Sequence, residues 1–381
     1  MPALSPSAEP GMRKIALVLG GGGMKGFAHI GVLKALEERG IRPALISGTS
    51  IGAMVAAASV AGTSPEELAH KAEGLKRRDL FRINHFGMLM DRMRSRSIYL
   101  EEPLRELCNQ VIPEGTFDEL QMPLLVNTVD LERGTPIVWG LPGLRDVSVR
   151  DAVYASCALP GFFPPGKVNE RVCVDGGVID NLPTAVSAIG MDMVIAVDVG
   201  SADLARMPGI AQQGFAAIYM RAAMTMMHSL QQYPLEQWSG PPMLLIRPKV
   251  GRDWLSFVRS AEHMREGYRA AKRALEHFDA YVEQPGGIYP RKRVQLNVIR
   301  DRCIGCGICV AVAPTYMGLD ASGKAFARTT VVEWSAADGD FVHQCPTHAI
   351  EANRQELVTP PRTSDSGDDA RTERPEAMGA A

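Results

Sequence analysis

The sequence predicts an α/β protein with a three-layer α/β/α arrangement and a mostly parallel sheet, followed by a small α+β region. Over residues 13–283, short apolar segments alternate with helical segments, which is typical of a sheet covered by helices on both faces. Residues 284–290, with two prolines and two glycines, then lead into a cysteine-containing region. Strands are expected near residues 14–19, 44–47, 123–129, 135–139, 171–174, 193–199 and 243–247.

The first expected strand, KIALVL at residues 14–19, runs directly into the glycine-rich loop GGGGMKG at residues 20–26. A helix is expected over Phe27–Arg39, and Gly40 closes it. Glycines between a strand and a helix can turn their backbone N–H groups inward and form a cradle for an anion. We interpret the loop as such a cradle for an oxyanion.

Nucleotide binding and a plain tight turn are the alternatives for this loop. Gly21, Gly23 and Gly26 fit the G-x-G-x-x-G spacing of dinucleotide sites, but the acidic residue expected about 20 positions later is missing. A phosphate-binding P-loop has its lysine after the last glycine, followed by Ser or Thr, whereas Lys25 precedes Gly26. Both observations favour the oxyanion cradle.

The second expected strand ends in GTSIG, residues 48–52, which fits the nucleophile-elbow pattern G-x-S-x-G. In an elbow the serine, here Ser50, occupies a sharp turn between a strand and a helix, with its hydroxyl exposed. Gly48 and Gly52 let neighbouring backbone pass closely. The helix after Ser50 points its amide dipoles toward an oxyanion formed there.

A carboxylate stands at the end of a later expected strand, in the segment Asp175-Gly176-Gly177. A carboxylate in this position can approach a serine hydroxyl directly and act as a general base without an intervening histidine. An ordinary Asp-Gly-Gly turn is the alternative when the segment is taken alone. The two upstream motifs favour the catalytic interpretation.

The order and spacing of these three motifs resemble the patatin-like phospholipases. The resemblance covers about residues 12–283 and includes GFAHIGVLKALEERGI after the first loop, ASCALPGFFPP at residues 155–165 and NLP at residues 181–183. It implies that Ser50 is the nucleophile and Asp175 the base of a Ser–Asp dyad. It also implies an oxyanion hole formed by the backbone amides of Gly21, Gly22 and Gly23.

The motifs that carry this resemblance contain six further residues with a supporting role. They are Lys25, Gly26, Gly48, Gly52, Gly176 and Gly177. The family often has arginine where this chain has Lys25, so the charge is kept and the bidentate fork is lost. The implied activity is hydrolysis of a lipid acyl ester through an acyl-serine. Acyl transfer to an alcohol or thiol stays open, because the same acyl-serine serves both reactions.

A Ser-His-Asp triad is the alternative to the dyad. None of the eight histidines in the sequence lies on a strand-end loop, where a triad histidine is expected. His29 falls among apolar positions of the first helix and is expected to be buried. His70, His263 and His277 fall in charged helical segments and are expected to be solvated. The sequence therefore favours a dyad.

A second chemical signature is CIGCGIC at residues 303–309, followed much later by a Cys-Pro pair. Three cysteines at this spacing can bind three corners of an iron–sulfur cube, and a distant cysteine supplies the fourth ligand. Residues 293–352 resemble a single-cluster, bacterial-type ferredoxin domain, which implies one 4Fe–4S cluster. Structural zinc, usually held by two separated cysteine pairs, and an empty site are the alternatives. The four expected ligands are Cys303, Cys306, Cys309 and Cys345.

The chain is therefore expected to have five segments. These are a flexible N-terminus at 1–12, a patatin-like acyl hydrolase domain at 13–283, a linker at 284–292, a 4Fe–4S ferredoxin-type domain at 293–356 and a disordered tail at 357–381. The remaining cysteines lie in apolar surroundings, and an iron–sulfur cluster implies a reducing compartment, so disulfides are not expected.

Composition limits the partners. A formal net charge of −2 over 381 residues argues against general nucleic-acid binding. The sequence has no run of about 18 apolar residues, and its first residues lack the basic and apolar parts of a secretory signal. A cytoplasmic location is therefore expected, with a lipid or acyl ester as the substrate.

Two segments have a composition that suits contact with lipid. Residues 71–96 mix basic and apolar side chains, which suits docking on an anionic bilayer, but a solvated helix face with core anchors explains the pattern too. Residues 215–227, FAAIYMRAAMTMM, suit an acyl groove or lid, and equally core packing or docking of the C-terminal domain. Peripheral membrane contact stays open.

The role of a cluster beside a hydrolase is a separate question, because ester hydrolysis moves no electrons. One hypothesis is a redox- or oxygen-gated lipase, in which loss of the cluster moves the C-terminal domain over the active site. A second is an electron-transfer or partner-binding module with a redox partner, in which the hydrolase-like domain holds an acyl ligand. A third is a structural cluster. The intact catalytic motifs favour the first.

Overall fold

The structure is a computed structural model. It describes residues 13–84, 97–200, 207–250, 259–335, 338, 341–342 and 344–358. The expected flexible N-terminus lies outside the described residues, as do residues 85–96 of the first lipid-contact segment. Of the expected tail, residues 357 and 358 are described, and they end a strand.

The main sheet has nine strands among the described residues, in the order β5-β6-β3-β2-β1-β7-β8-β9, with β4 paired to β3. Five strand pairs are parallel (β1–β2, β1–β7, β2–β3, β7–β8 and β8–β9), and three, β3–β4, β3–β6 and β5–β6, are antiparallel. The predicted mostly parallel sheet is confirmed. The strands are β1 Ile15–Leu19, β2 Leu45–Thr49, β3 Leu124–Asp130, β4 Thr135–Trp139, β5 Gly166–Val168, β6 Arg171–Asp175, β7 Met193–Val197, β8 Met243–Ile246 and β9 Ile288–Tyr289.

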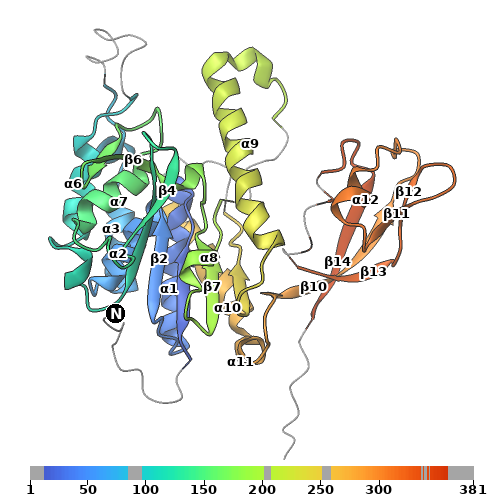
Figure 1. Ribbon diagram of the computed structural model, residues 1–381, viewed down its shortest axis with the longest axis horizontal. Coiled ribbons are helices and arrows are strands. Elements are labelled where there is room, and N and C mark those ends of the chain that lie inside the picture. Colours follow the sequence, from blue (N-terminus) through green and yellow to red (C-terminus); the bar gives the residue numbers. More distant parts are fainter. Residues whose placement is uncertain are drawn as a thin grey trace, which may run out of the picture.

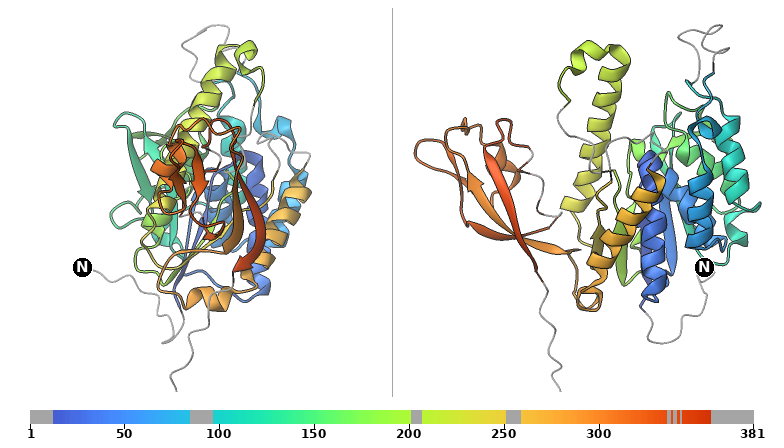
Figure 2. Two further views of the ribbon diagram at one scale, coloured as in Figure 1. Left: turned by 90° about the vertical axis from the view of Figure 1, so that its right-hand side faces the viewer. Right: turned by 180° about the vertical axis from the view of Figure 1, so that it is seen from behind.

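Helices cover both faces of this sheet, which confirms the three layers (Figures 1 and 2). All of β1 is buried, and its side chains alternate between two cores. Leu17 packs into the core that contains residues of α1, α2, α7 and α10, whereas Val18 packs into the opposite core with Leu182 and Leu235. A strand buried on both faces needs a continuous apolar sequence, which KIALVL supplies.

The helices on these faces have the following bounds. They are α1 Ala28–Glu38, α2 Ile51–Val60, α3 Pro65–Gly74, α4 Arg77–Leu80, α6 Glu102–Val111, α7 Val149–Cys157, α8 Thr184–Ser187, α9 Phe215–Glu236, α10 Ser260–Leu275 and α11 Phe278–Val282. Short 3-10 turns are η1 Gly23–Phe27, η3 Phe117–Glu119, η4 Gly176–Val178 and η5 Ile210–Gln213. No helix among the described residues is long and apolar enough to cross a membrane.

Some elements differ from the predictions. The strands β5 and β9 were not expected, because three and two residues are too few to show a hydrophobic period. The first helix begins at Ala28, after the 3-10 turn η1, rather than at Phe27. The charged helical region that contains His263 and His277 is divided into α10 and α11, because His277 leaves helical geometry at φ −116° and ψ 25°.

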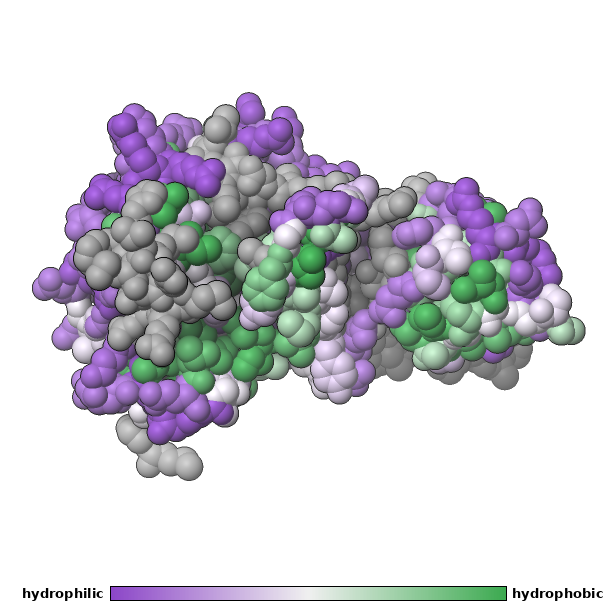
Figure 3. Space-filling model, turned by 90° about the horizontal axis from the view of Figure 1, so that it is seen from above, coloured by the Kyte–Doolittle hydropathy of each residue, from purple (hydrophilic) through white to green (hydrophobic). Residues whose placement is uncertain are grey.

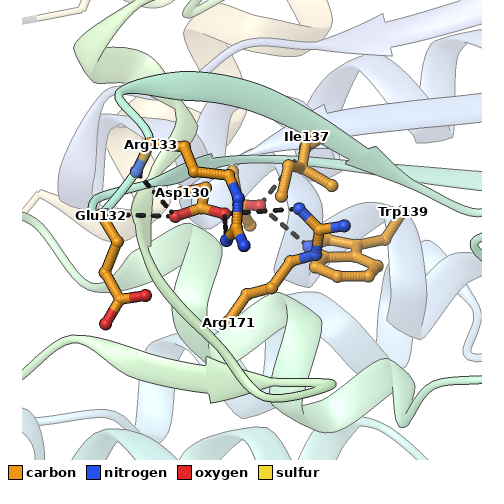
Figure 4. A network of polar contacts seen from close by, with 7 residues as sticks. Asp130, Glu132, Arg133, Ile137, Trp139 and Arg171 are labelled. Carbon is orange, nitrogen blue, oxygen red and sulfur yellow. Dashed lines mark hydrogen bonds and ion pairs between the residues drawn. The ribbon is translucent and has the colours of Figure 1, made fainter.

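Asp130, at the end of β3, joins the turn to β4 and the start of β6 (Figure 4). Its buried carboxylate accepts hydrogen bonds from the backbone N–H groups of Glu132 and Arg133, at 3.1 Å each, and from the guanidinium groups of Arg133, at 2.9 Å, and Arg171, at 3.3 Å. Burial alone would raise the pKa of Asp130, but Arg133 and the amides outweigh it and lower that pKa. Because Arg171 begins β6, the network holds β6 in the register that positions Asp175.

The C-terminal region forms the small α+β unit that was expected. β10 (Arg291–Val298), β13 (Val331–Trp334) and β14 (Ile350–Val358) make an antiparallel sheet in the order β13-β10-β14. β11 (Met317–Leu319) pairs with β12 (Ala325–Ala327), and α12 spans Ile308–Val312. Within the range expected as a linker, β9 already belongs to the main sheet and β10 begins at Arg291, so only Pro290 separates the two sheets.

Candidate active site

Ser50 occupies the turn between β2 and α2, as the elbow motif predicts. Its φ of 56° and ψ of −130° are unusual for a residue with a side chain, and such backbone costs about 1–3 kcal/mol. The two flanking positions must be glycine because neighbouring backbone atoms lie too close for a side chain. A Cβ on Gly48 would lie 2.5 Å from the backbone nitrogen of Ala53, and one on Gly52 would lie 2.2 Å from the carbonyl oxygen of Leu19.

Ser156, on α7, is hydrogen-bonded to this strained turn. The backbone N–H of Ser50 donates to the Ser156 hydroxyl oxygen at 2.9 Å, and that hydroxyl donates to the backbone carbonyl of Asn127 at 2.7 Å. Ser156 is fully buried, so both bonds form away from water. A single side chain therefore ties the elbow to β3.

The register of the sheet brings Asp175 to Ser50. Thr49 pairs with Asn127 on one side of β3, and Thr128 pairs with Asp175 on the other side. The Ser50 hydroxyl is a hydrogen-bond partner of the Asp175 carboxylate, which also accepts the backbone N–H of Gly177 at 2.8 Å. Residues 125 positions apart thus meet across one strand.

The Asp175 carboxylate is buried, and its pKa is raised from an ordinary 3.8 to about 6. Desolvation is the main cause, and the hydrogen bonds from Ser50 and the Gly177 amide oppose it. A carboxylate with a pKa near 6 is ionised at neutral pH and is a stronger base than an exposed aspartate. This is the pKa that suits a group which takes a proton at neutral pH.

The glycine-rich loop lies against the same serine. A Cβ on Gly21 would come within 3.2 Å of the Ser50 Cβ, so this loop closes one side of the hydroxyl. The Gly21 amide donates to the Asn181 carbonyl at 3.2 Å, and the Asn181 side chain donates to the Gly21 carbonyl at 2.9 Å. Among the described residues, the amides of Gly22, which precedes η1, and Gly23, which begins it, donate to no acceptor.

Ser50, Asp175 and the glycine loop line a cavity of about 150 Å³. Its other walls are mainly apolar and come from α2, α4, α6, α9 and the loop that follows α7. Burial raises the pKa of the Cys157 thiol well above its ordinary value, which keeps this neighbouring group protonated and poorly nucleophilic. The polar side chains of the lining are Ser50, Cys157, Asp175, Asn181, His228 and Gln231.

The supporting residues of the motifs lie around this site but do not all line it. Lys25 is fully buried and is not part of the cavity lining. Its charge acts on His263, whose pKa it helps to lower. Gly26 packs against Ile51, where a Cβ would come within 2.0 Å of the Ile51 side chain. Gly176 packs equally closely on β3, where a Cβ would lie 2.5 Å from a backbone carbonyl oxygen.

The histidine predictions have mixed outcomes. His29 is buried as expected: it contacts the Gly20 carbonyl at 2.8 Å, and burial lowers its pKa to about 4. The prediction that His263 is solvated is wrong. It is buried on the inner face of α10, contacts the Met24 carbonyl at 3.3 Å and has a lowered pKa from burial. Its neighbours in sequence are charged, but its own position falls on the apolar side of the helix.

Three polar residues of the site were not predicted from the sequence. Ser156 and Asn181 lie in the segments ASCALPGFFPP and NLP, which carried the resemblance without a residue role. Gln231 lies on α9, and its buried Nε2 has no hydrogen-bond partner among the described residues. No local signal marks Gln231, because it lies in a methionine-rich helix far from every motif.

The four cysteines of the C-terminal region lie near one another. Cys303, Cys309 and Cys345 belong to one small core, and Cys306 is exposed. The Cys303 sulfur accepts the Ala325 amide at 3.3 Å, and the Cys345 sulfur accepts the Ala349 amide at 3.3 Å. As placed, no three His, Cys, Asp or Glu side chains of the described residues form a metal-ligand group. Four thiols with amide donors to sulfur are nevertheless the donor set that suits an iron–sulfur cluster.

Comparison with known protein families gives one match in the main-sheet region and another in the cysteine-containing C-terminal region. Residues 17–187 match the family model described as patatin-like phospholipase, and residues 296–352 match the 4Fe-4S single cluster domain. An uncharacterized NTE family protein of Mycobacterium tuberculosis is 34% identical over 191 residues, which are 50% of each chain. Patatin-like phospholipase domain-containing protein 6 of Homo sapiens is 33% identical over 192 residues, 50% of this chain and 14% of that one. The chain thus spans half or less of the length of these relatives.

Among solved structures, VipD from Legionella pneumophila is similar at a TM-score of 0.39 and 17% identity, over 69% of this chain and 67% of that chain. ExoU of Pseudomonas aeruginosa, in complex with SpcU, is similar at a TM-score of 0.38 and 16% identity, over 73% of this chain and 54% of that chain. By the family models, residues 17–187 are similar to a patatin-like phospholipase domain, and residues 296–352 are similar to the 4Fe-4S single cluster domain.

Proposed function

We propose that this chain is a serine hydrolase of lipid acyl esters, with Ser50 as nucleophile and Asp175 as general base. The observation that carries the proposal is the contact between a strained, cavity-facing serine hydroxyl and a buried carboxylate. A serine held in unfavourable backbone geometry next to a desolvated base is a costly arrangement for a structural turn. It is the arrangement that nucleophilic catalysis requires.

The mechanism follows from the positions of these groups. As the Ser50 oxygen attacks the ester carbonyl, its proton moves to Asp175, and a tetrahedral oxyanion forms. The amides of Gly22 and Gly23 stabilise this oxyanion, whereas the Gly21 amide is already bonded to the Asn181 carbonyl. Protonated Asp175 then gives its proton to the leaving alcohol, and ionised Asp175 activates the water that releases the fatty acid.

An apolar acyl group is the substrate part that fits the cavity, because its walls are mainly aliphatic and aromatic. The names of the relatives support the same substrate class: one is a phospholipase domain-containing protein, and another is lysophospholipase NTE1 of Mycosarcoma maydis. Within the cavity, the Gln231 Nε2, which has no hydrogen-bond partner among the described residues, is a donor for a polar oxygen of the substrate.

The test is hydrolysis of p-nitrophenyl acyl esters by anaerobically purified protein. Wild type is expected to turn over, and Ser50→Ala and Asp175→Asn are expected to fall by a factor of at least about 10³. Asp180→Asn is a matched control, because Asp180 is a nearby, partly buried aspartate whose carboxylate accepts the backbone N–H of Leu182. An inert wild type with full iron and sulfide content would favour the partner-binding alternative instead.

We further propose that Cys303, Cys306, Cys309 and Cys345 hold one 4Fe–4S cluster, a one-electron redox centre when bound. The match of residues 296–352 and the amide donors at two of the sulfurs support this. No described residue of this region lines the cavity, so the proposed ester chemistry uses groups of the main sheet's domain alone. Iron and sulfide analysis of wild type and Cys306→Ser tests the ligand set. Esterase rates before and after anaerobic reduction then separate a gate, in which rates change, from a structural cluster, in which they do not.

A further inference from the structure

Helix α9 has two faces of different character. Met224, Met227, His228 and Gln231 line the cavity. The other face carries exposed apolar side chains at spacings of three, four or seven residues, which fall on one side of a helix, so they form one stripe. We call this the outer stripe; its members are Phe215, Ile218, Tyr219, Met226, Leu230 and Tyr233. None of these six is charged.

The N-terminal end of α9 projects beyond the rest of the main domain (Figures 1 and 2). Phe215 is 80% exposed and Tyr219 is 61% exposed, and their rings stack with centroids 6.0 Å apart. Seen from above, hydrophobic residues gather near the middle of the molecule, where α9 stands in Figure 1, beside hydrophilic ones, and they continue onto the adjoining part of the main domain (Figure 3). Exposed aromatic side chains that stack on each other at a projecting helix end indicate a surface that binds a partner.

The cavity is also lined by a segment that carries basic side chains on its exposed side. Leu80 and Phe81 line the cavity, and the adjacent Ile83 is exposed. The same short segment exposes four basic side chains against a single acidic one, Asp79. The four are Lys76, Arg77, Arg78 and Arg82. Both elements therefore contribute to the cavity lining: α9, which carries the outer stripe, and the segment 76–83, which carries basic side chains and the exposed Ile83.

We propose that the outer stripe and the basic segment 76–83 dock the chain onto an anionic phospholipid bilayer. The basic side chains match anionic headgroups, and the aromatic residues at the end of α9 suit the boundary between headgroups and acyl chains. Because α9 and residues 80–81 both line the cavity, docking through these two elements brings the cavity close to the surface that holds the substrate. The choice of a lipid surface rests on the proposed function, but binding to that surface is measured independently of turnover.

The experiment is sedimentation of the full chain with vesicles of phosphatidylcholine, with and without phosphatidylglycerol. Wild type is expected to bind the mixed vesicles more tightly than phosphatidylcholine alone. The double variant Phe215→Ser/Tyr219→Ser is expected to bind about tenfold or more weakly, from the apolar area lost. Its hydrolysis of a soluble p-nitrophenyl ester is expected to match wild type, since neither residue lines the cavity.

Matched controls lie at the opposite end of the sheet. Ile189 is 73% exposed in the turn before the amino end of β7, so Ile189→Ser removes an exposed apolar residue far from the cavity. Arg77→Glu is expected to abolish the preference for phosphatidylglycerol, whereas Arg42→Glu, before the amino end of β2, is expected to keep it. Both controls should bind as wild type does.

Three results would overturn the docking proposal. Wild type could fail to sediment with either vesicle, or the α9 double variant could bind as tightly as wild type. Light scattering without vesicles could also show a dimer that the double variant abolishes, which would assign the stripe to a second copy. Hydrolysis of soluble ester without vesicle binding defeats docking alone, and vesicle binding without any hydrolysis defeats the proposed function alone.

Discussion

Replacing Asp175 by asparagine is expected to stabilise the protein while it removes activity. The folded carboxyl has a pKa of about 6 against an ordinary 3.8, so an ionised Asp175 costs stability at neutral pH. The difference corresponds to about 3 kcal/mol at pH 7.5. Asparagine keeps the acceptor for the Gly177 amide and carries no charge to desolvate.

The pH dependence gives this prediction its sign. A raised carboxyl pKa means that stability is fully present below about 3.8 and is lost as pH rises through about 6. The advantage of Asp175→Asn over wild type should therefore shrink from about 3 kcal/mol at pH 7.5 to about half of that at pH 5. Loss of the bond from the Ser50 hydroxyl lowers both values by a similar amount.

Urea unfolding at the two pH values, followed by tryptophan fluorescence, measures these differences. Asp180→Asn is the control for loss of a partly buried carboxylate near the site that is not a partner of Ser50. If Asp175→Asn is less stable than wild type at both pH values, or if its advantage does not change with pH, the carboxylate is not a desolvated base. The reasoning from burial would then be refuted.

Three further predictions concern the same site and its neighbours. For a soluble ester, kcat/KM should fall about tenfold per pH unit below about 6, because only ionised Asp175 accepts the proton; a rate that stays flat to pH 4.5 would speak against this base. Ser156→Ala should lower the free energy of unfolding in urea by about 2 kcal/mol, because two hydrogen bonds are lost, and it should also lower kcat. Ser156→Thr is the control, because it keeps the hydroxyl. Equal stability of wild type and both variants would mean that Ser156 does not hold the elbow. Gln231→Leu should raise KM about tenfold for an ester with a polar head and less for a plain p-nitrophenyl ester; an equal rise for both would exclude a contact with the polar part.

The parts of the fold that follow from local pattern could be predicted. The strand KIALVL is continuous and apolar because it is buried on both faces, and GTSIG marks a turn that only two close-packed glycines allow. β9, with two residues, has no period to detect and exists because β8 offers it an edge. His263 was misjudged because burial depends on the face of α10 that meets η1, not on the charge of its neighbours.

The candidate site shows the same division. The order and spacing of three sequence motifs identify Ser50, Asp175 and the glycine loop. Ser156 and Gln231 reach the site through tertiary packing of α7 and α9, which no sequence spacing encodes. The meeting of Ser50 with Asp175 itself depends on an antiparallel β6 beside β3, and the register of that pair is fixed partly by the buried Asp130 network.

The most direct test of the central claim is covalent labelling of the nucleophile. A fluorophosphonate should add one label to wild type, and peptide mapping by mass spectrometry should place it on Ser50. Ser50→Ala should take no label, and Asp175→Asn should react far more slowly, because its amide cannot accept the serine proton. A label on another residue, or ester hydrolysis that continues in Ser50→Ala, would contradict a Ser50–Asp175 dyad as the catalytic centre of this chain.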